Sequence, residues 1–265
     1  MNVQTRMKCL HRLTCAGLGL LVAAIGGCGD GAGDDGGPSR AVGETTVDLD
    51  ARTETVRSGE ALLGNLVADA VRAGVPDAQV ALVNAGALRY DATARSSGIY
   101  PAGPITESDV HEMMPFELDS DDTTVLVTLT GAQLASVLDR AVSSFNTAAA
   151  ETAEERRGWF LHISGGSFVA DISKQAQIYN PDTDAVETEG QRIESLQVGG
   201  QDVTPDGAYK VATTGFIAGG QDGHKGFTEG TGRTDSGKAM PTLLIEYLEA
   251  NSPVTPVLEG RITLK

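Results

Sequence analysis

The sequence predicts an α+β (mixed α/β) domain in which a mixed sheet is flanked by helices. Strand-like and helix-like runs follow one another without the regular alternation of an all-parallel α/β fold. The chain has 265 residues, of which 40% are apolar, and this suits a globular core. We therefore expect one sizeable folded domain without internal repeats.

Each element is predicted from apolar periodicity and from the residues that cap or end it. Polar and apolar residues alternate over residues 45–49, as in a first strand. Ser58 is expected to cap a helix that Gly74 closes. Further strands are expected at residues 80–84, 123–130, 167–171, 193–198, 209–213 and 260–264, and further helices at 104–110, from 131 onwards and at 238–251.

Residues 1–27 are expected to be a lipoprotein signal peptide. Three basic residues precede a mostly apolar run at residues 13–25, which is too short to span a bilayer as a stable anchor. Small residues directly before Cys28 are typical of bacterial lipoproteins, so Cys28 is the predicted lipidation site. An ordinary secretory signal is the alternative. The expected location is outside the cytoplasm, as a membrane-anchored lipoprotein of the cell envelope, periplasm or cell surface.

The segment after the signal is expected to be a tether. Residues 28–44 are rich in Gly and Asp, a composition that cannot bury a core, so the folded domain is expected to cover residues 45–265. The formal net charge of −16 argues against a nucleic-acid partner, because such a surface needs a basic footprint.

The stretch Asn-Ala-Gly-Ala-Leu-Arg, residues 84–89, is the first candidate for a binding site. It follows the apolar run at residues 80–83, which is typical of a buried strand. Asn84 and Arg89 would then lie near the C-terminal end of that strand, where α/β sheets place ligand groups. A turn carrying a surface arginine is the alternative.

Other motifs follow in a fixed order along the chain. Taken together they resemble the C-terminal domain of the 5'-nucleotidase family, from about residue 45 to residue 265. The motifs are Arg57 before residues 64–70, residues 84–89, Pro115-Phe116, residues 129–134, Gly158 before residues 164–166, and Phe216 with Asp222-Gly223.

The resemblance implies that the domain binds the nucleoside part of a nucleotide. Phe116 and Phe216 match two aromatic residues that sandwich the base, and Asp222 matches an acid that accepts hydrogen bonds from the ribose hydroxyls. Alternatively, Phe116 fills the core and Asp222 caps a glycine-rich turn.

The same resemblance assigns roles to four further positions. Arg57 and Arg89 match arginines on the ribose and phosphate side, Asn84 an amide near the base, and Gly158 a glycine whose backbone lies close to the ligand.

The chain departs from the family pattern at several positions. Ala85 and Ala87 replace glycines, and an alanine is costly there if the backbone needs a positive φ. Gln221 also replaces a glycine, and His224 replaces an aromatic residue. Leu118 stands where many members have a base-contacting Asn, and an acidic insertion follows it. Base contacts are therefore expected to be weaker or altered.

The resemblance implies that hydrolysis belongs to a separate metallophosphatase domain with two metal ions. After the signal, the histidines are His111, His162 and His224, and no Gly-Asn-His-Glu or Gly-Asn-His-Asp signature occurs. Asp109 and His111 form an Asp-x-His that we interpret as chance. We therefore expect no catalytic residue, metal site or cofactor in this chain, and divalent metals only with a partner domain.

Three functions remain open from the sequence. The first is a nucleotide- or nucleoside-binding surface protein in nucleotide catabolism or scavenging. The second is a subunit of a split 5'-nucleotidase, a phosphoric ester hydrolase whose metallophosphatase domain is a separate chain. The third is a degenerate structural or adhesive domain.

Overall fold

The computed structural model describes residues 39–117, 122–146 and 158–265. The predicted signal peptide, Cys28 and most of the predicted tether lie outside the described residues. None of the helices in the described ranges combines the length and the apolar character that a bilayer-spanning segment requires.

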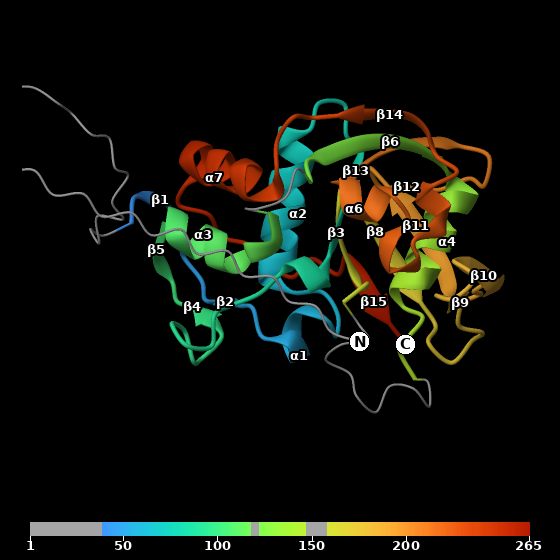
Figure 1. Cartoon of the computed structure of the whole chain (residues 1–265), viewed down its shortest axis with the longest axis horizontal. Coiled ribbons are helices and arrows are strands. Elements are labelled where there is room, and N and C mark those ends of the chain that lie inside the picture. The colour runs from blue at the N-terminus through green and yellow to red at the C-terminus, as the bar shows by residue number, and fades with distance from the viewer. Residues whose placement is uncertain (1–38, 118–121, 147–157) are drawn as a thin grey trace, which may run out of the picture. The chain divides into compact units, whose positions relative to one another are not determined.

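The centre of the fold is a five-stranded mixed sheet (Figure 1). Its strands β3 and β13 pair in parallel, whereas the other neighbours in the sheet are antiparallel. Every residue of β3 is buried. Alternate residues belong to two apolar cores, with Ala81 and Val83 in one and Val80 and Leu82 in the other. In spatial order the strands are β14 (Thr231–Asp235), β6 (Thr124–Thr130), β13 (Ala208–Thr214), β3 (Val80–Asn84) and β7 (Leu161–Ser164).

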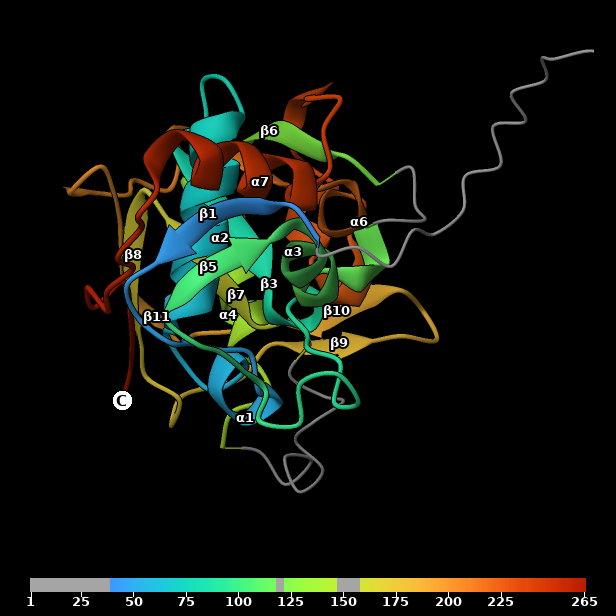
Figure 2. The same cartoon turned by 90° about the vertical axis from the view of Figure 1, so that its left-hand side faces the viewer.

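The first core lies between this sheet and a layer of helices. Leu63 and Val67 of α2 pack there with Leu244 and Leu248 of α7. The pair β1–β5 borders α7, and Figure 2 shows these strands side by side. The helices on this side of the sheet are α1 (Thr53–Val56), α2 (Leu62–Gly74), α3 (Glu107–Met113) and α7 (Met240–Asn251). The short strands that accompany them are β1 (Ala41–Thr45), β2 (Leu49–Asp50), β4 (Ile99–Tyr100) and β5 (Gly103–Thr106).

The second core lies on the opposite face, between the central sheet, α4 and a four-stranded sheet. Leu134 and Leu138 of α4 meet Phe168 of β8 in this core. The elements are α4 (Gly131–Ala141), β8 (Gly166–Ala170), β11 (Ile193–Val198), β12 (Gln201–Asp202) and β15 (Ile262–Leu264), with the hairpin β9 (Ile178–Asn180) and β10 (Ala185–Thr188) beside them. The mixed sheets flanked by helices confirm the predicted fold class.

Most predicted elements occur close to their expected positions, but the first strand does not. β1 covers Ala41–Thr45, so it begins within the segment 28–44 that the sequence assigned to the tether. Residues 41–45 are held by their pairing with β5, more than fifty residues away, and no local sequence pattern indicates that pairing. Residues 46 and 47, expected in the strand, form a bend, and Asp48 belongs to no regular element.

The first long helix also begins later than expected. α2 starts at Leu62 and its N-cap is Ala61, so the prediction that Ser58 caps this helix is wrong. Glu60 precedes the helix, and its Oε1 accepts hydrogen bonds from Asn65 Nδ2 at 2.7 Å and from the Glu259 N–H at 2.8 Å. Glu60 therefore fastens the start of α2 to the C-terminal segment.

Candidate ligand-binding site

A cavity of about 1010 Å³ forms at one end of the central sheet, where β3 and β13 end and where β6 and β7 begin. β3 and β13 are parallel neighbours, so their C-terminal ends, Asn84 and Thr214, reach the same edge. The antiparallel neighbours start at this edge, because Thr124 of β6 pairs with Thr214 and Leu161 of β7 pairs with Asn84. The cavity lining includes every binding residue singled out from the sequence, namely Arg57, Asn84, Arg89, Phe116, Gly158, Phe216 and Asp222.

Two exposed aromatic rings stand in the lining of this cavity. Phe116 lies in the 3₁₀ helix η2 (Pro115–Glu117) and is 59% exposed, and Phe216 lies in α6 (Gly215–Ala218) and is 45% exposed. The alternative that Phe116 fills the core is therefore wrong. Rings exposed to this extent leave apolar area that a flat ligand can cover.

Arg89 supports the first of these rings. Its guanidinium carbon lies 5.0 Å from the centre of the Phe116 ring, and its Nε donates a hydrogen bond to the Gly86 carbonyl at 2.8 Å. Burial lowers the pKa of the Arg89 guanidinium. Arg57 caps the end of α1 elsewhere in the lining and is 4% exposed. The phosphate-side role of both arginines remains a prediction.

The segment after β3 is held by a close backbone contact between two glycines. The Gly86 N–H donates to the Gly158 carbonyl at 2.7 Å, and a Cβ on Gly86 would lie 2.9 Å from that oxygen. Ala85 and Ala87 flank Gly86 in η1 (Ala85–Ala87), and neither has a positive φ. Ala85 and Ala87, which stand in place of glycines, therefore carry no strain from a positive φ.

Asp222 occupies a conformation that is uncommon for a residue with a side chain. It lies in η4 (Gln221–Gly223) with φ 56° and ψ 13°, in the left-handed region. Gln221 does not share this conformation, so a glycine is not required there. Burial raises the pKa of the Asp222 carboxyl, and the charges of Arg140 and Arg57 oppose that rise. The cavity thus places an acidic group beside cationic ones.

The structure adds Asp122, which the sequence analysis did not select. Asp122 lines the cavity, and its Oδ1 accepts a hydrogen bond from the Phe216 N–H at 2.8 Å. Burial raises the pKa of this carboxyl, and the Phe216 N–H opposes the rise. Asp122 ends the acidic insertion, in which nothing distinguishes it from its neighbours. Leu118, where the family places an amide, lies outside the described residues.

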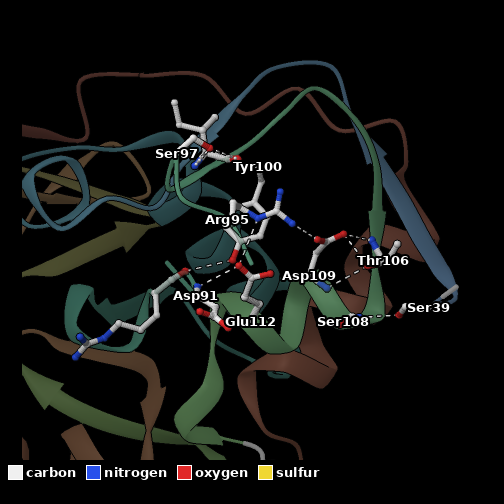
Figure 3. Close-up of polar contacts among 11 residues, drawn as sticks. Ser39, Asp91, Arg95, Ser97, Tyr100, Thr106, Ser108, Asp109 and Glu112 are labelled. Atoms are coloured by element: carbon white, nitrogen blue, oxygen red, sulfur yellow. Dashed lines mark hydrogen bonds and ion pairs between the residues drawn. The ribbon is translucent and has the colours of Figure 1, made fainter. Parts of the chain in front are cut away.

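A polar cluster joins α3 to the loop between β3 and β4 (Figure 3). Arg89 lies in this loop, and Phe116 follows α3. Arg95 forms ion pairs with Asp109 and Glu112 of α3, and its guanidinium carbon lies 4.1 Å from the centre of the Tyr100 ring. The end of α3 is joined to the loop because the Arg89 N–H donates to the Met113 carbonyl at 2.8 Å. This cluster fixes the loop between β3 and β4 against the helix that leads to Phe116.

Asp109, the first residue of the Asp-x-His motif, belongs to the same cluster. Asp109 Oδ2 accepts hydrogen bonds from the N–H and the hydroxyl of Thr106, which caps α3, while Oδ1 bonds Arg95 (Figure 3). The carboxylate is therefore part of a capping box. Among all described residues, no group of three or more His, Cys, Asp and Glu side chains could hold a metal ion.

Comparison with known proteins identifies a family. The family profile "5'-nucleotidase, C-terminal domain" matches residues 41–229. The chain is 30% identical over 225 residues to the trifunctional nucleotide phosphoesterase protein YfkN of Bacillus subtilis, covering 83% of this chain and 14% of that protein. It is 26% identical over 232 residues to the 5'-nucleotidase of Mus musculus, covering 83% of this chain and 36% of that protein.

A solved structure shows the same relationship. The 5'-nucleotidase precursor from Thermus thermophilus superposes with a TM-score of 0.68 and 29% identity, covering 85% of this chain and 39% of that one. The chain therefore spans well under half of the length of these relatives.

The Gly86–Gly158 contact yields a first prediction. Gly86→Ala should lower the free energy of unfolding by about 1–3 kcal/mol, because its Cβ would collide with the Gly158 carbonyl. Gly158→Ala is the matched control, since its Cβ would come no closer than 3.6 Å to Gly86. Urea denaturation measures both variants. Equal effects from the two alanines would contradict the asymmetry of this contact.

A second prediction concerns His224, which is fully buried directly after Gly223. Its Nε2 hydrogen-bonds the Trp159 carbonyl at 3.0 Å, and burial lowers its pKa to about 3. The unfolded chain, with a histidine pKa of about 6.5, binds the proton more readily than the folded one. The free energy of unfolding should therefore fall as the pH drops below about 6.5, by at most about 1.4 kcal/mol per pH unit for each such histidine.

His224→Phe removes this contribution while keeping a ring in the same place. Urea denaturation between pH 7.5 and about 5.5, above the range where carboxyls titrate, should give a flatter pH dependence for the variant. Parallel curves for the variant and the unmodified protein would show that His224 is not held neutral by the fold.

Proposed function

This chain belongs to the family of 5'-nucleotidase C-terminal domains, and we propose that its cavity binds the nucleoside part of a nucleotide. The observation that carries the proposal is the pair Phe116 and Phe216. Both rings are about half exposed, they come from separate segments, and they line one cavity. A base between two rings covers that apolar area, and stacking is worth about 1–3 kcal/mol per base.

The charged groups of the lining support the same ligand class. Asp222 is an acceptor for O–H donors, as ribose hydroxyls are, and Arg57 provides a cation for a phosphate. Asp122, bonded to the backbone of Phe216, adds a second acceptor near the ring. We propose that nucleosides presenting hydrogen-bond donors at the base edge suit this cavity best.

The biological setting is part of the proposal. We propose that Cys28 carries a lipid anchor, that the domain acts outside the cytoplasm, and that it serves nucleotide catabolism or scavenging. This rests on the residues before Cys28 and on relatives that are named as a nucleotide phosphoesterase and a 5'-nucleotidase.

A split enzyme is the second candidate, suggested by relatives that are named as a nucleotide phosphoesterase and a 5'-nucleotidase. The chain covers only 14% of the Bacillus subtilis relative and 36% of the mouse one, so most of each relative has no counterpart in the matched region. In this version a metallophosphatase domain would dock at the cavity and carry out the hydrolysis. The structural or adhesive alternative predicts no ligand at all.

Calorimetric titration with adenosine and with AMP tests the proposal. The protein should bind both, and Phe216→Ala should weaken both by about tenfold or more, because one stacking face is lost. Ile178→Ala is the matched control, since Ile178 is 47% exposed and does not line the cavity. It should leave the dissociation constants within about twofold.

The outcomes separate ligand binding, hydrolysis by this chain and the structural alternative. Binding without phosphate release from AMP, tested with Mn²⁺, Zn²⁺ and Co²⁺, supports a binding protein or a split enzyme. Phosphate release that scales with both protein and metal would assign hydrolysis to this chain. An absence of binding up to millimolar adenosine would overturn the proposal and favour the structural alternative.

A further inference from the structure

An arginine that does not line the cavity lies directly behind its acidic group. Arg140 of α4 is largely buried, and its guanidinium carbon lies 4.3 Å from the centre of the Trp159 ring and 5.1 Å from that of Tyr179. Burial lowers the pKa of Arg140 to about 10, so the side chain keeps its charge at neutral pH. A buried cation held over two rings is a rigid structural support.

This cation is bonded to the backbone of Asp222. Arg140 Nε donates to the Asp222 carbonyl at 2.7 Å, and Nη1 donates to Ser143 Oγ at 3.2 Å. Asp222 has a φ of 56°, a conformation that is unfavourable for a residue with a side chain. The hydrogen bond from Arg140 offsets that cost and fixes the direction of the backbone at this residue.

Gly223 shows how closely the backbone lies on this cation. Its φ is 81°, and a Cβ there would stand 2.7 Å from Arg140 Nε and 2.8 Å from the Tyr179 ring. The peptide after Asp222 therefore rests directly on the guanidinium. A side chain at residue 223 would therefore displace the Arg140 guanidinium or the Tyr179 ring.

The same guanidinium reaches a second wall of the cavity. Trp159 directly follows Gly158, whose carbonyl holds Gly86. The Arg140 guanidinium also contacts the Tyr179 ring. The Tyr179 hydroxyl donates to Asp184 at 2.7 Å, and Asp184 forms an ion pair with Lys225 at 2.6 Å. Arg140 thus connects the backbone of Asp222, the Gly158 segment and the β9–β10 hairpin through contacts made by a single side chain.

We propose that Arg140 is a positioning residue, which holds Asp222 in its left-handed conformation so that the carboxylate faces the hydroxyls of a bound ribose. The inference rests on the proposed function and adds a residue that touches no ligand. Its positive charge also attracts the carboxylate that it positions. Lysine cannot replace it, because an ammonium lacks the planar, directional Nε–H donor.

The test compares adenosine with 2',3'-dideoxyadenosine, which keeps the base and the 5'-hydroxyl but lacks the 2'- and 3'-hydroxyls of the ribose. The unmodified protein should prefer adenosine. Arg140→Lys should weaken adenosine binding by about tenfold and dideoxyadenosine binding by less than about twofold. Asp222→Asn should give the same selective loss, and the double variant should lose no more than either single one.

Arg192→Lys is the matched control. Arg192 is also buried, and its side chain donates to the carbonyls of Lys174, Val142 and Phe145, which do not line the cavity. It should change stability without changing the preference for adenosine. Trp159 is the only tryptophan of the chain, so its fluorescence emission reports on this site alone and should change in Arg140→Lys but not in Arg192→Lys.

Each contrary outcome is distinct. Equal weakening of both ligands by Arg140→Lys would reduce Arg140 to a general structural role. Equal affinity of the unmodified protein for both ligands would show that Asp222 does not contact the ribose, which overturns this inference and leaves base binding intact. Failure of the unmodified protein to bind either ligand would overturn the proposed function together with the inference.

Discussion

The parallel pairing of β3 with β13 is the constraint on which the cavity depends. Because the two strands run in the same direction, both end at one edge of the sheet, and their following segments meet there. The antiparallel strands on either side begin at that edge. Residues separated by more than one hundred positions, such as Asn84 and Phe216, are thereby brought into one lining.

The segments at this edge are then held by contacts made with the backbone. Gly86 is bonded to Gly158, Phe216 to the Asp122 carboxylate, and Asp222 to Arg140. Each contact fixes the backbone at one residue. The backbone in turn sets the direction in which the side chains of that segment leave the main chain. The buried cores on both faces of the sheet supply the rigid base for these loops. Such an arrangement holds the lining in place before any ligand arrives, which would lower the entropic cost of the proposed binding.

The sequence predicted the parts of the fold with a strong local signal. The continuous apolar run at residues 80–83 located β3, and β6 lies within the strand expected at residues 123–130. The helix expected from residue 131 is α4, which Thr130 caps together with Gln133. The residues expected to bind ligand were found through the order of their motifs, and the structure brings them together. Their binding roles remain predictions.

Other features could not be predicted because their partners are distant in the chain. β1 is ordered by pairing with β5, and Arg140 bonds a carbonyl 82 residues away. Neither leaves a periodic or spaced pattern in the sequence. The concern over Ala85 and Ala87 could be settled only by backbone angles, which show no positive φ at either residue.

A crystal structure of the protein with adenosine tests the central claim most directly. The account predicts the base between the rings of Phe116 and Phe216, with the ribose hydroxyls within hydrogen-bond distance of the Asp222 carboxylate and the Arg140 contact unchanged. Adenosine bound elsewhere, or a saturated crystal in which both rings stay exposed to solvent, would contradict it.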